Sequence, residues 1–409
     1  MITERVDMNL VIKFFGKNKR LLKLVPCLLI LSLLVVGCAG PTFQGWSGFA
    51  ERDGILYFGG INGEVYAIDI AARGQNATFP GPKEWVFTLP RTGTPGTICG
   101  PACAPAAPVG SIYATPVITG DLLCVGIYSG DTGRLVALNR LAPGYNEGVP
   151  QRSKGEWMYP SGANKMGAIV GSPVVIGNTL FVGSSDGKLY AIDAVYGEKK
   201  WDFNTGGKIW TSPVVDGDVV YISNYEKKLF AVSSTDGSQI WSTELQASIA
   251  SSPALSPDSI FVGAFNNHLY AIDRTTGKER WNFEGGNWFW STPVVKDDTV
   301  YAGCLDDKVY AISANTGEQK WQFTANGPIV STPVLADNLL AVASEIGDIY
   351  VIDADNGELV RSIHLGYQSK APLLADGDTV FVHTGNFCVY SINVKTGEKT
   401  WEFCYSTIE

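Results

Sequence analysis

The 409-residue sequence has little positive charge and little histidine. It holds 31 Lys and Arg against 40 Asp and Glu, a net charge of −9, and no basic stripe follows the N-terminal segment. Because phosphate binding needs clustered Lys and Arg, no nucleic-acid partner is expected. The three histidines, His268, His364 and His383, are widely separated, and no residues have the spacing of a nucleophile and its base. We therefore expect no catalytic residues and no metal site.

Long apolar segments are also lacking. An apolar run from Leu24 to Val36 is too short to span a bilayer comfortably and suits the core of a signal peptide. Basic residues precede it, and it ends in VVGC (residues 35–38), which resembles the lipoprotein box of bacteria. We expect residues 1–37 to be a signal peptide, Cys38 to carry lipid, and residues 38–42 to form a short linker. The alternative is an uncleaved membrane anchor. In both cases the remaining chain lies outside the cytoplasm, lipid-anchored in our interpretation to the cell membrane or an outer membrane.

Cysteine is sparse, with eight in the chain and no two adjacent. Outside the cytoplasm disulfides can form. Cys99 and Cys103, close together in the loop sequence CGPAC, are the favoured disulfide pair, with a metal site as the weaker alternative. Cys388 and Cys404 fall on neighbouring predicted strands, and whether they face each other depends on a register that the sequence leaves open. Cys124 and Cys304 lie in strand-like apolar runs, where buried thiols are expected.

Tryptophan, in contrast, recurs at a fixed step. LYAIDAVYGEKKW (residues 189–201) returns as LFAVSSTDGSQIW, LYAIDRTTGKERW and VYAISANTGEQKW, each 40 residues after the last. Each repeat holds four short β-rich runs separated by Gly, Asp and Asn, with no helical period. A 40-residue unit of four strands is typical of one propeller blade. Arg361 takes the tryptophan position in one copy, and the tryptophans that close the others are Trp85, Trp157, Trp201, Trp241, Trp281, Trp321 and Trp401.

The repeated letters predict a structural role for these tryptophans. A glycine four residues before each of the regularly spaced ones occupies a turn that needs a left-handed residue. An alanine ten residues before most of them leaves room for a large ring. The indole can then pack against the next blade and find a partner for its N–H. Stacking on a ligand is the alternative, which such regular placement does not favour.

These residues resemble the quinoprotein-type repeat, with its Ala-x-Asp-x-x-x-Gly-x-x-x-Trp docking motif. That repeat builds the propellers of pyrroloquinoline-quinone (PQQ) dehydrogenases and of the BamB lipoproteins, non-enzymatic factors in outer-membrane protein assembly. The resemblance covers nearly all of the chain after the anchor. It implies an all-β fold over residues 43–406: an eight-bladed β-propeller of four-stranded antiparallel blades, each blade drawn from one continuous segment.

The resemblance leaves two classes of function open. PQQ dehydrogenases carry long insertions, a pair of adjacent cysteines and a carboxylate cluster for calcium, and repeats 3 to 8 of this chain lack such features. We therefore expect a non-enzymatic scaffold without cofactor that binds proteins of the cell envelope, like BamB. The alternatives are a PQQ-dependent, calcium-binding quinoprotein, and a propeller that binds wall polymers or acts as a sensor. The longer insertions in repeats 1 and 2 have two interpretations: they bind a partner, or they are surface loops without a function.

One set of aromatic residues falls outside the docking motif. Each repeat opens with an apolar stretch before Ser/Thr-Pro, such as IWTSP, which the resemblance places on the innermost strand. Equivalent positions in a closed ring converge on its axis, so these side chains are candidates for a pocket that binds a peptide, a sugar or a planar ligand. The alternative is that they fill space between inner strands. The candidate binding residues are Trp46, Tyr113, Trp210, Trp288, Trp290 and, as a cationic edge, Lys370.

Overall fold

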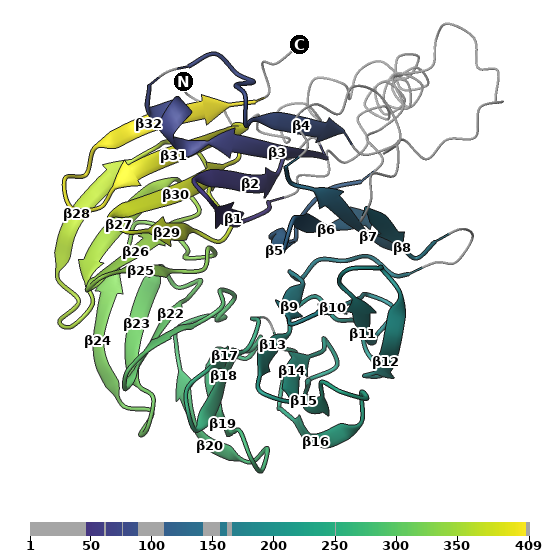
Figure 1. Cartoon of the computed structure of the whole chain (residues 1–409). Helices are drawn as coiled ribbons and strands as arrows, with labels where there is room; N and C mark the ends of the chain where they lie inside the picture. The colour runs from purple at the N-terminus through teal and green to yellow at the C-terminus, as the bar shows by residue number, and fades with distance from the viewer. Residues whose placement is uncertain are drawn as a thin grey trace, which may run out of the picture. The chain divides into compact units, whose positions relative to one another are not determined.

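Eight four-stranded antiparallel sheets follow one another along the chain in the computed structural model (Figure 1), which confirms the predicted all-β propeller. The structure describes residues 46–60, 63–75, 77–88, 110–141, 156–161, 166–249 and 251–405. They belong to one unit, Gln44–Glu409. The predicted signal peptide, the candidate lipid anchor Cys38 and the candidate disulfide pair Cys99 and Cys103 lie outside the described residues.

The first four blades run from Phe49 to Glu244. Blade 1 is β1 (Phe49–Arg52), β2 (Ile55–Gly59), β3 (Glu64–Asp69) and β4 (Trp85–Thr88). Blade 2 is β5 (Val117–Thr119), β6 (Leu122–Ser129), β7 (Thr132–Asn139) and β8 (Trp157–Tyr159). Blade 3 is β9 (Val174–Ile176), β10 (Thr179–Gly183), β11 (Lys188–Asp193) and β12 (Lys199–Asn204). Blade 4 is β13 (Val214–Asp216), β14 (Val219–Ser223), β15 (Lys228–Ser233) and β16 (Gln239–Glu244).

The last four blades run from Ala254 to Cys404. Blade 5 is β17 (Ala254–Leu255), β18 (Ser259–Gly263), β19 (His268–Asp273) and β20 (Glu279–Glu284). Blade 6 is β21 (Val294–Lys296), β22 (Thr299–Gly303), β23 (Lys308–Ser313) and β24 (Gln319–Thr324). Blade 7 is β25 (Val334–Ala336), β26 (Leu339–Ala343), β27 (Asp348–Asp353) and β28 (Leu359–His364). Blade 8 is β29 (Leu374–Asp376), β30 (Thr379–Thr384), β31 (Cys388–Asn393) and β32 (Lys399–Cys404).

Burial explains why the strands differ in composition. The first strand of each blade lies nearest the centre and the fourth lies outside (Figure 1). The second and third strands are covered on both faces by neighbouring blades, so β14 (VVYIS) and β15 (KLFAVS) are apolar almost throughout. The outer strand β16 (QIWSTE) alternates between half-buried and exposed residues. The core is therefore a ring of inter-blade clusters.

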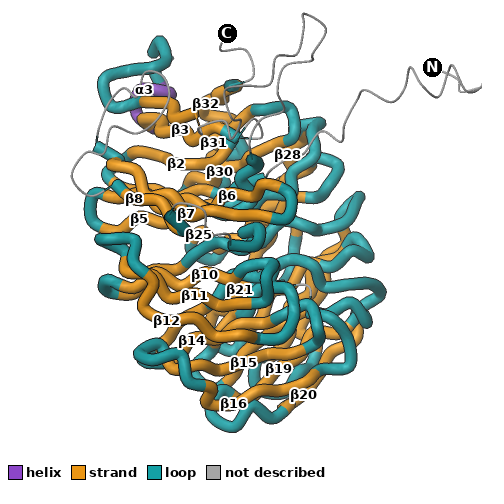
Figure 2. Tube along the Cα trace, turned by 90° about the vertical axis from the view of Figure 1, so that its right-hand side faces the viewer, coloured by secondary structure: helices purple, strands orange, loops and turns teal. Residues whose placement is uncertain are grey.

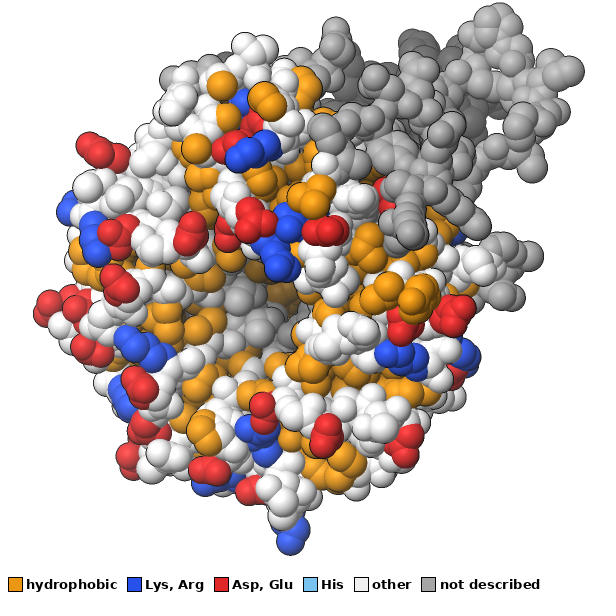
Figure 3. All heavy atoms as spheres, in the orientation of Figure 1, with side chains coloured by type: hydrophobic (Ala, Val, Ile, Leu, Met, Phe, Trp, Pro, Cys, Tyr) orange, Lys and Arg blue, Asp and Glu red, His pale blue; other side chains and the backbone are white. Residues whose placement is uncertain are grey.

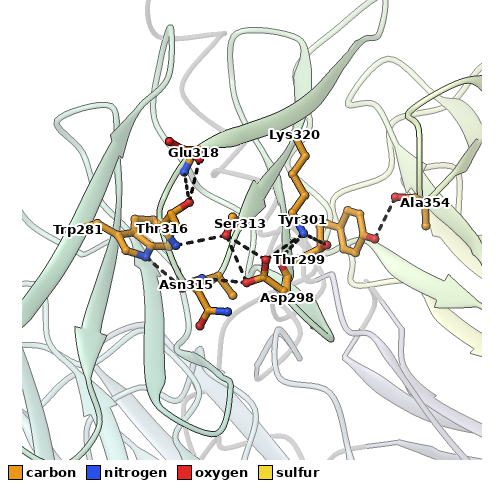
Figure 4. Close-up of polar contacts among 11 residues, drawn as sticks. Trp281, Asp298, Thr299, Tyr301, Ser313, Asn315, Thr316, Glu318, Lys320 and Ala354 are labelled. Atoms are coloured by element: carbon orange, nitrogen blue, oxygen red, sulfur yellow. Dashed lines mark hydrogen bonds and ion pairs between the residues drawn. The ribbon is translucent and has the colours of Figure 1, made fainter.

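The repeated tryptophans lie between blades. Six of the indole N–H groups donate to a backbone carbonyl of the following blade: Trp85 to Arg140 (3.2 Å), Trp157 to Ala194 (3.1 Å), Trp201 to Ser234 (3.2 Å), Trp241 to Arg274, Trp281 to Ala314 and Trp321 to Ala354 (each 3.0 Å). Figure 4 shows this contact for Trp281. Arg361, which replaces the tryptophan in blade 7, donates from Nε to the carbonyl of Lys395 at 2.7 Å. The arginine thus keeps a hydrogen bond to the following blade, with an acceptor one residue further along the chain, but it has no indole ring.

The turn glycine at this contact is required both by its backbone conformation and by the space that the indole needs. Gly357 has φ +77°, and a Cβ built on it would lie 2.7 Å from the ring of Trp321. Across the sheet, Ala311 lies directly opposite Trp321 in the β23–β24 register. Any larger residue at either position would displace the indole. The thirteen repeated letters are thus the parts of one inter-blade contact.

The ring closes by packing, because no described strand passes between blades 1 and 8. The insertion in repeat 1 forms α3 (Ile70–Gly74), which packs against β32 of blade 8 (Figure 2). Its Arg73 pairs with buried Glu84 at 2.8 Å and lies over the ring of Phe403. This insertion therefore has a structural role in closing the ring. No helix among the described residues is long and apolar enough to cross a membrane.

Cysteine burial and pairing are also visible in the described residues. Cys388 and Cys404 are opposite each other in the β31–β32 register and form a disulfide, with 4.1 Å between their Cα atoms. The register left open by the sequence thus brings the two sulfurs together. Cys124 and Cys304 are free and buried, as expected. Burial raises the pKa of each thiol to about 12, so neither is a reactive thiolate near neutral pH.

Candidate functional site

The stretch that carries the candidate aromatic residues is a connection between blades and not the innermost strand. In blade 4 the inner strand β13 begins at Val214, so Trp210 precedes it. The reason is Pro213, which has no N–H to donate to a strand partner. The N–H of Ser212 instead donates to Oγ of Ser252 in the next blade at 2.8 Å. The expectation that these residues lie on the inner strand was therefore wrong.

Three of the predicted residues gather in one aromatic cluster, which we define as Trp210, Tyr225, Phe265, Trp288 and Trp290. Ring centroids of Trp210 and Tyr225 lie 5.0 Å apart, and those of Tyr225 and Phe265 lie 6.0 Å apart. Phe265 then contacts Trp288 at 4.8 Å and Trp290 at 5.6 Å. The cluster thus links blade 4, blade 5 and the connection that leads into blade 6.

Much of this cluster faces solvent. Trp210 is 44% exposed, Trp288 41%, Tyr225 38% and Trp290 37%. Rings whose only role was to fill space between inner strands would be buried. Phe289, which separates Trp288 from Trp290 in the sequence, is an example, because its side chain is fully buried. The molecule is hollowed at the centre of the face seen in Figure 3, with hydrophobic side chains around the hollow. A contiguous exposed aromatic surface marks a site of interaction.

The other predicted residues form a second, smaller group. The rings of Trp46 and Tyr113 meet edge to face with centroids 4.9 Å apart, and Nζ of Lys370 lies 5.8 Å from the Trp46 ring centroid. Lys370 also pairs with Glu345 at 2.8 Å, so its charge is shared with a carboxylate. Burial raises the pKa of Tyr113. Trp46, Tyr113 and Lys370 are all half-buried, so this group offers less open surface than the aromatic cluster.

Sequence reasoning missed Tyr225 and Phe265. Both occupy the turn between the second and third strands, where other blades carry Ser185, Leu305 and Glu345. The N–H of Tyr225 donates to the carbonyl of Lys208 at 2.8 Å, which fixes the turn beside the Trp210 connection. The available signal in the sequence was that two successive repeats carry an aromatic residue at the same repeat position. Only the ring contacts in the structure show that these rings meet the tryptophans.

The calcium site of the dehydrogenase alternative finds no support in the described residues. Among them, no three His, Cys, Asp or Glu side chains lie together in a group able to hold a metal ion. The aromatic cluster itself contains no carboxylate. What it offers is apolar ring surface with the hydroxyl of Tyr225, a surface for binding rather than for acid–base chemistry.

Comparisons with known proteins agree with this architecture. The crystal structure of BamB from Moraxella catarrhalis matches with a TM-score of 0.60 and 16% identity, covering 82% of this chain and 90% of that chain. The computationally designed Ika8 protein matches with a TM-score of 0.61 and 15% identity, covering 83% and 93%. Identities this low show the fold alone. No curated protein matches the chain.

A family model adds evidence at the level of sequence. The model described as outer membrane protein assembly factor BamB matches three overlapping segments, residues 125–253, 226–332 and 327–407. Together they span more than half of the chain, including six complete blades and part of another. This chain therefore belongs to the BamB family of PQQ-type repeat propellers.

Proposed function

We propose that the chain is a non-enzymatic scaffold, held outside the cytoplasm by a lipid on Cys38, that binds partner proteins of the cell envelope. The observation that carries this proposal is the aromatic cluster, a set of five rings, four of them exposed, on an otherwise regular scaffold. The occupant we infer is an extended apolar segment of a partner protein. Trp and Tyr supply large rigid contact areas and are favoured anchors in protein interfaces.

Membership of the BamB family supports a protein partner, because the family model is described as a protein assembly factor. The described residues offer no group suited to a catalytic metal, which gives no support to the dehydrogenase alternative. That alternative makes a separate prediction: the purified protein with added PQQ and calcium would show quinone absorbance and dye-linked alcohol oxidation. We expect neither.

Removal of two tryptophans should separate binding from folding. In a Trp210→Ala/Trp290→Ala variant we expect partner recovery by crosslinking to fall at least tenfold, while the free energy of unfolding changes by about 1 kcal/mol or less, as for exposed side chains. Recovery is measured by mass spectrometry of crosslinked complexes from the native envelope.

The matched control is Tyr196→Ala, which removes an exposed aromatic side chain (72% exposed) from blade 3, outside the cluster. This variant should keep every partner. Full partner recovery by the double tryptophan variant would refute the cluster as a binding site. Unfolding of that variant would show that the two rings serve packing instead.

The lipid anchor has its own test. We expect the mature protein to begin at Cys38, with a mass increased by lipid, and a Cys38→Ser variant to remain unprocessed and lose lipid attachment. Intact-protein mass spectrometry and membrane fractionation measure both effects. Normal cleavage and lipid attachment in the variant would refute the anchor without bearing on the aromatic cluster.

A further inference from the structure

A polar clamp closes the outer edge of three blades. In blade 6, Nζ of Lys320 on the outer strand donates to the carbonyl of Asp298 (2.6 Å) and to Oγ1 of Thr299 (2.9 Å), as Figure 4 shows. Blades 3 and 5 repeat the arrangement with Lys200 on Asn178 and Thr179, and Arg280 on Asp258 and Ser259. In each, a basic side chain spans from the outer strand to the start of the second strand.

Blade 7 lacks both members of the clamp, with Val360 and Leu339 in their places, and so does blade 4. Ile240 stands where the basic residue would be, and Val219 replaces the hydroxyl residue. Ile240 is 52% exposed. A pocket of about 430 Å³ opens here, between blades 4 and 5, lined by Asp216, Val219, Ile240, Trp241, Pro257 and Arg274 among others. In blade 4 the missing clamp thus coincides with a pocket.

The backbone acceptor of the clamp is still present in blade 4. The carbonyl of Asp218 accepts the N–H of Ser234 at 2.9 Å, as the carbonyl of Asp298 accepts the N–H of Ala314 in blade 6. In blade 6 the lysine ammonium supplies a second donor to that oxygen. Within the described part of the chain, no side chain supplies it to Asp218. One acceptor site of this carbonyl is thus open, next to Val219 of the pocket lining.

The charges around the pocket also suit a cation. Arg274 is the basic residue of the lining, and it is already engaged. Its guanidinium pairs with Asp216, lies over the ring of Tyr221, and donates from Nη1 to the carbonyls of Ser256 (2.9 Å) and Pro257 (3.1 Å). The Asp216 side chain stays 59% exposed, and Asp218 is exposed beside it. The edge is therefore acidic, next to an apolar wall.

We propose that this pocket binds a lysine side chain of a partner polypeptide. The ammonium donates to the carbonyl of Asp218 beside the carboxylates, and the aliphatic stem packs on Val219 and Ile240. The partner supplies in trans the group that Lys200 and Lys320 supply within their own blades. A lysine fits better than a purely apolar side chain, because the apolar residue would leave the second acceptor site of the carbonyl without a donor.

This inference deepens the proposed scaffold function at a second place on the molecule, and it can fail separately. The test uses the purified chain with ¹⁵N-labelled tryptophan and follows the indole N–H signal of Trp241, assigned with Trp241→Phe. The probe is Nα-acetyl-lysine N-methylamide. We expect a saturable shift of the Trp241 signal, and at least tenfold weaker binding of the norleucine analogue, which has the stem without the ammonium.

Two variants complete the design. Val219→Thr/Ile240→Lys restores the clamp and should abolish the shift, while Ile240→Leu, the matched control, should keep it. Conversely, Thr299→Val/Lys320→Ile removes the clamp of blade 6 and should create a pocket there that the probe reports at Trp321. Absence of a saturable shift in the natural protein, or equal binding of the norleucine analogue, would overturn the proposal. Neither result would bear on partner recovery through the aromatic cluster.

Discussion

Replacing Trp321 with alanine is expected to lower the free energy of unfolding by about 3–5 kcal/mol, the range for emptying a buried tryptophan site. The indole is 8% exposed, packs beside Tyr301 with ring centroids 5.7 Å apart, and donates to the carbonyl of Ala354. The variant loses all of these contacts, and the glycine turn at Gly357 cannot refill the space because it has no side chain. Guanidinium denaturation measures the change as a shift of midpoint at constant slope.

Two further substitutions divide this effect. Trp321→Phe keeps most of the ring volume but removes the N–H, so it should cost about 1–2 kcal/mol through the hydrogen bond and the smaller ring. Trp288→Ala removes an indole that is 41% exposed and should cost less than about 1 kcal/mol. If Trp321→Ala also cost less than about 1 kcal/mol, the repeated tryptophans would not hold blades together.

The docking contact could be predicted from sequence because it recurs. Each copy of Gly, Ala and Trp keeps the same spacing, and spacing within a hairpin determines which residues meet across it. Even the exception stays close to this geometry, since Arg361 reaches the carbonyl of Lys395, one residue beyond the equivalent position. For this recurring contact, the period of 40 residues was sufficient.

Features that break the repeat were not predictable in the same way. The aromatic cluster needs a turn residue, Tyr225, to lie beside a connection residue, Trp210, and no spacing encodes this. The pocket beside Ile240 is defined by a missing side chain, which is visible only after the clamp of the sister blades has been seen. The sequence shows which residues are equivalent in the repeats. The effect of a difference between equivalent residues is visible only in the structure, where their neighbours are known.

The seam between blades 8 and 1 shows the same limit and leads to the second large expected effect. Position 383 is glycine, serine or alanine in the equivalent place of other blades, such as Gly303, where a Cβ would lie 2.4 Å from Ile329 of the next blade. His383 fills this place at the seam, fully surrounded by protein, against Phe49 and Phe58 of blade 1. A titratable ring thus takes the role of an apolar contact.

The hydrogen bonds of His383 determine its protonation state. Nδ1 lies 2.9 Å from the carbonyl of Ser47, which can only accept, so Nδ1 carries the proton. Nε2 then accepts the hydroxyl hydrogen of Tyr405 at 2.8 Å. Burial disfavours the charged imidazolium and lowers the pKa of His383 from the ordinary 6.5 to about 4. The folded protein therefore holds this histidine neutral at pH values where the unfolded chain protonates it.

Acid should consequently weaken the closure of the ring. The contribution of His383 to stability is complete above pH 6.5 and is lost as the pH falls from 6.5 towards 4, because the unfolded state binds the extra proton in that range. A shift of this size corresponds to about 3 kcal/mol. We expect the free energy of unfolding, measured by denaturant titration at each pH, to fall by that amount relative to a His383→Gln variant. The His268→Gln control alters a half-buried histidine away from the seam and should follow the natural protein. Parallel pH profiles for the natural protein and His383→Gln would show that His383 does not control the acid stability of the seam.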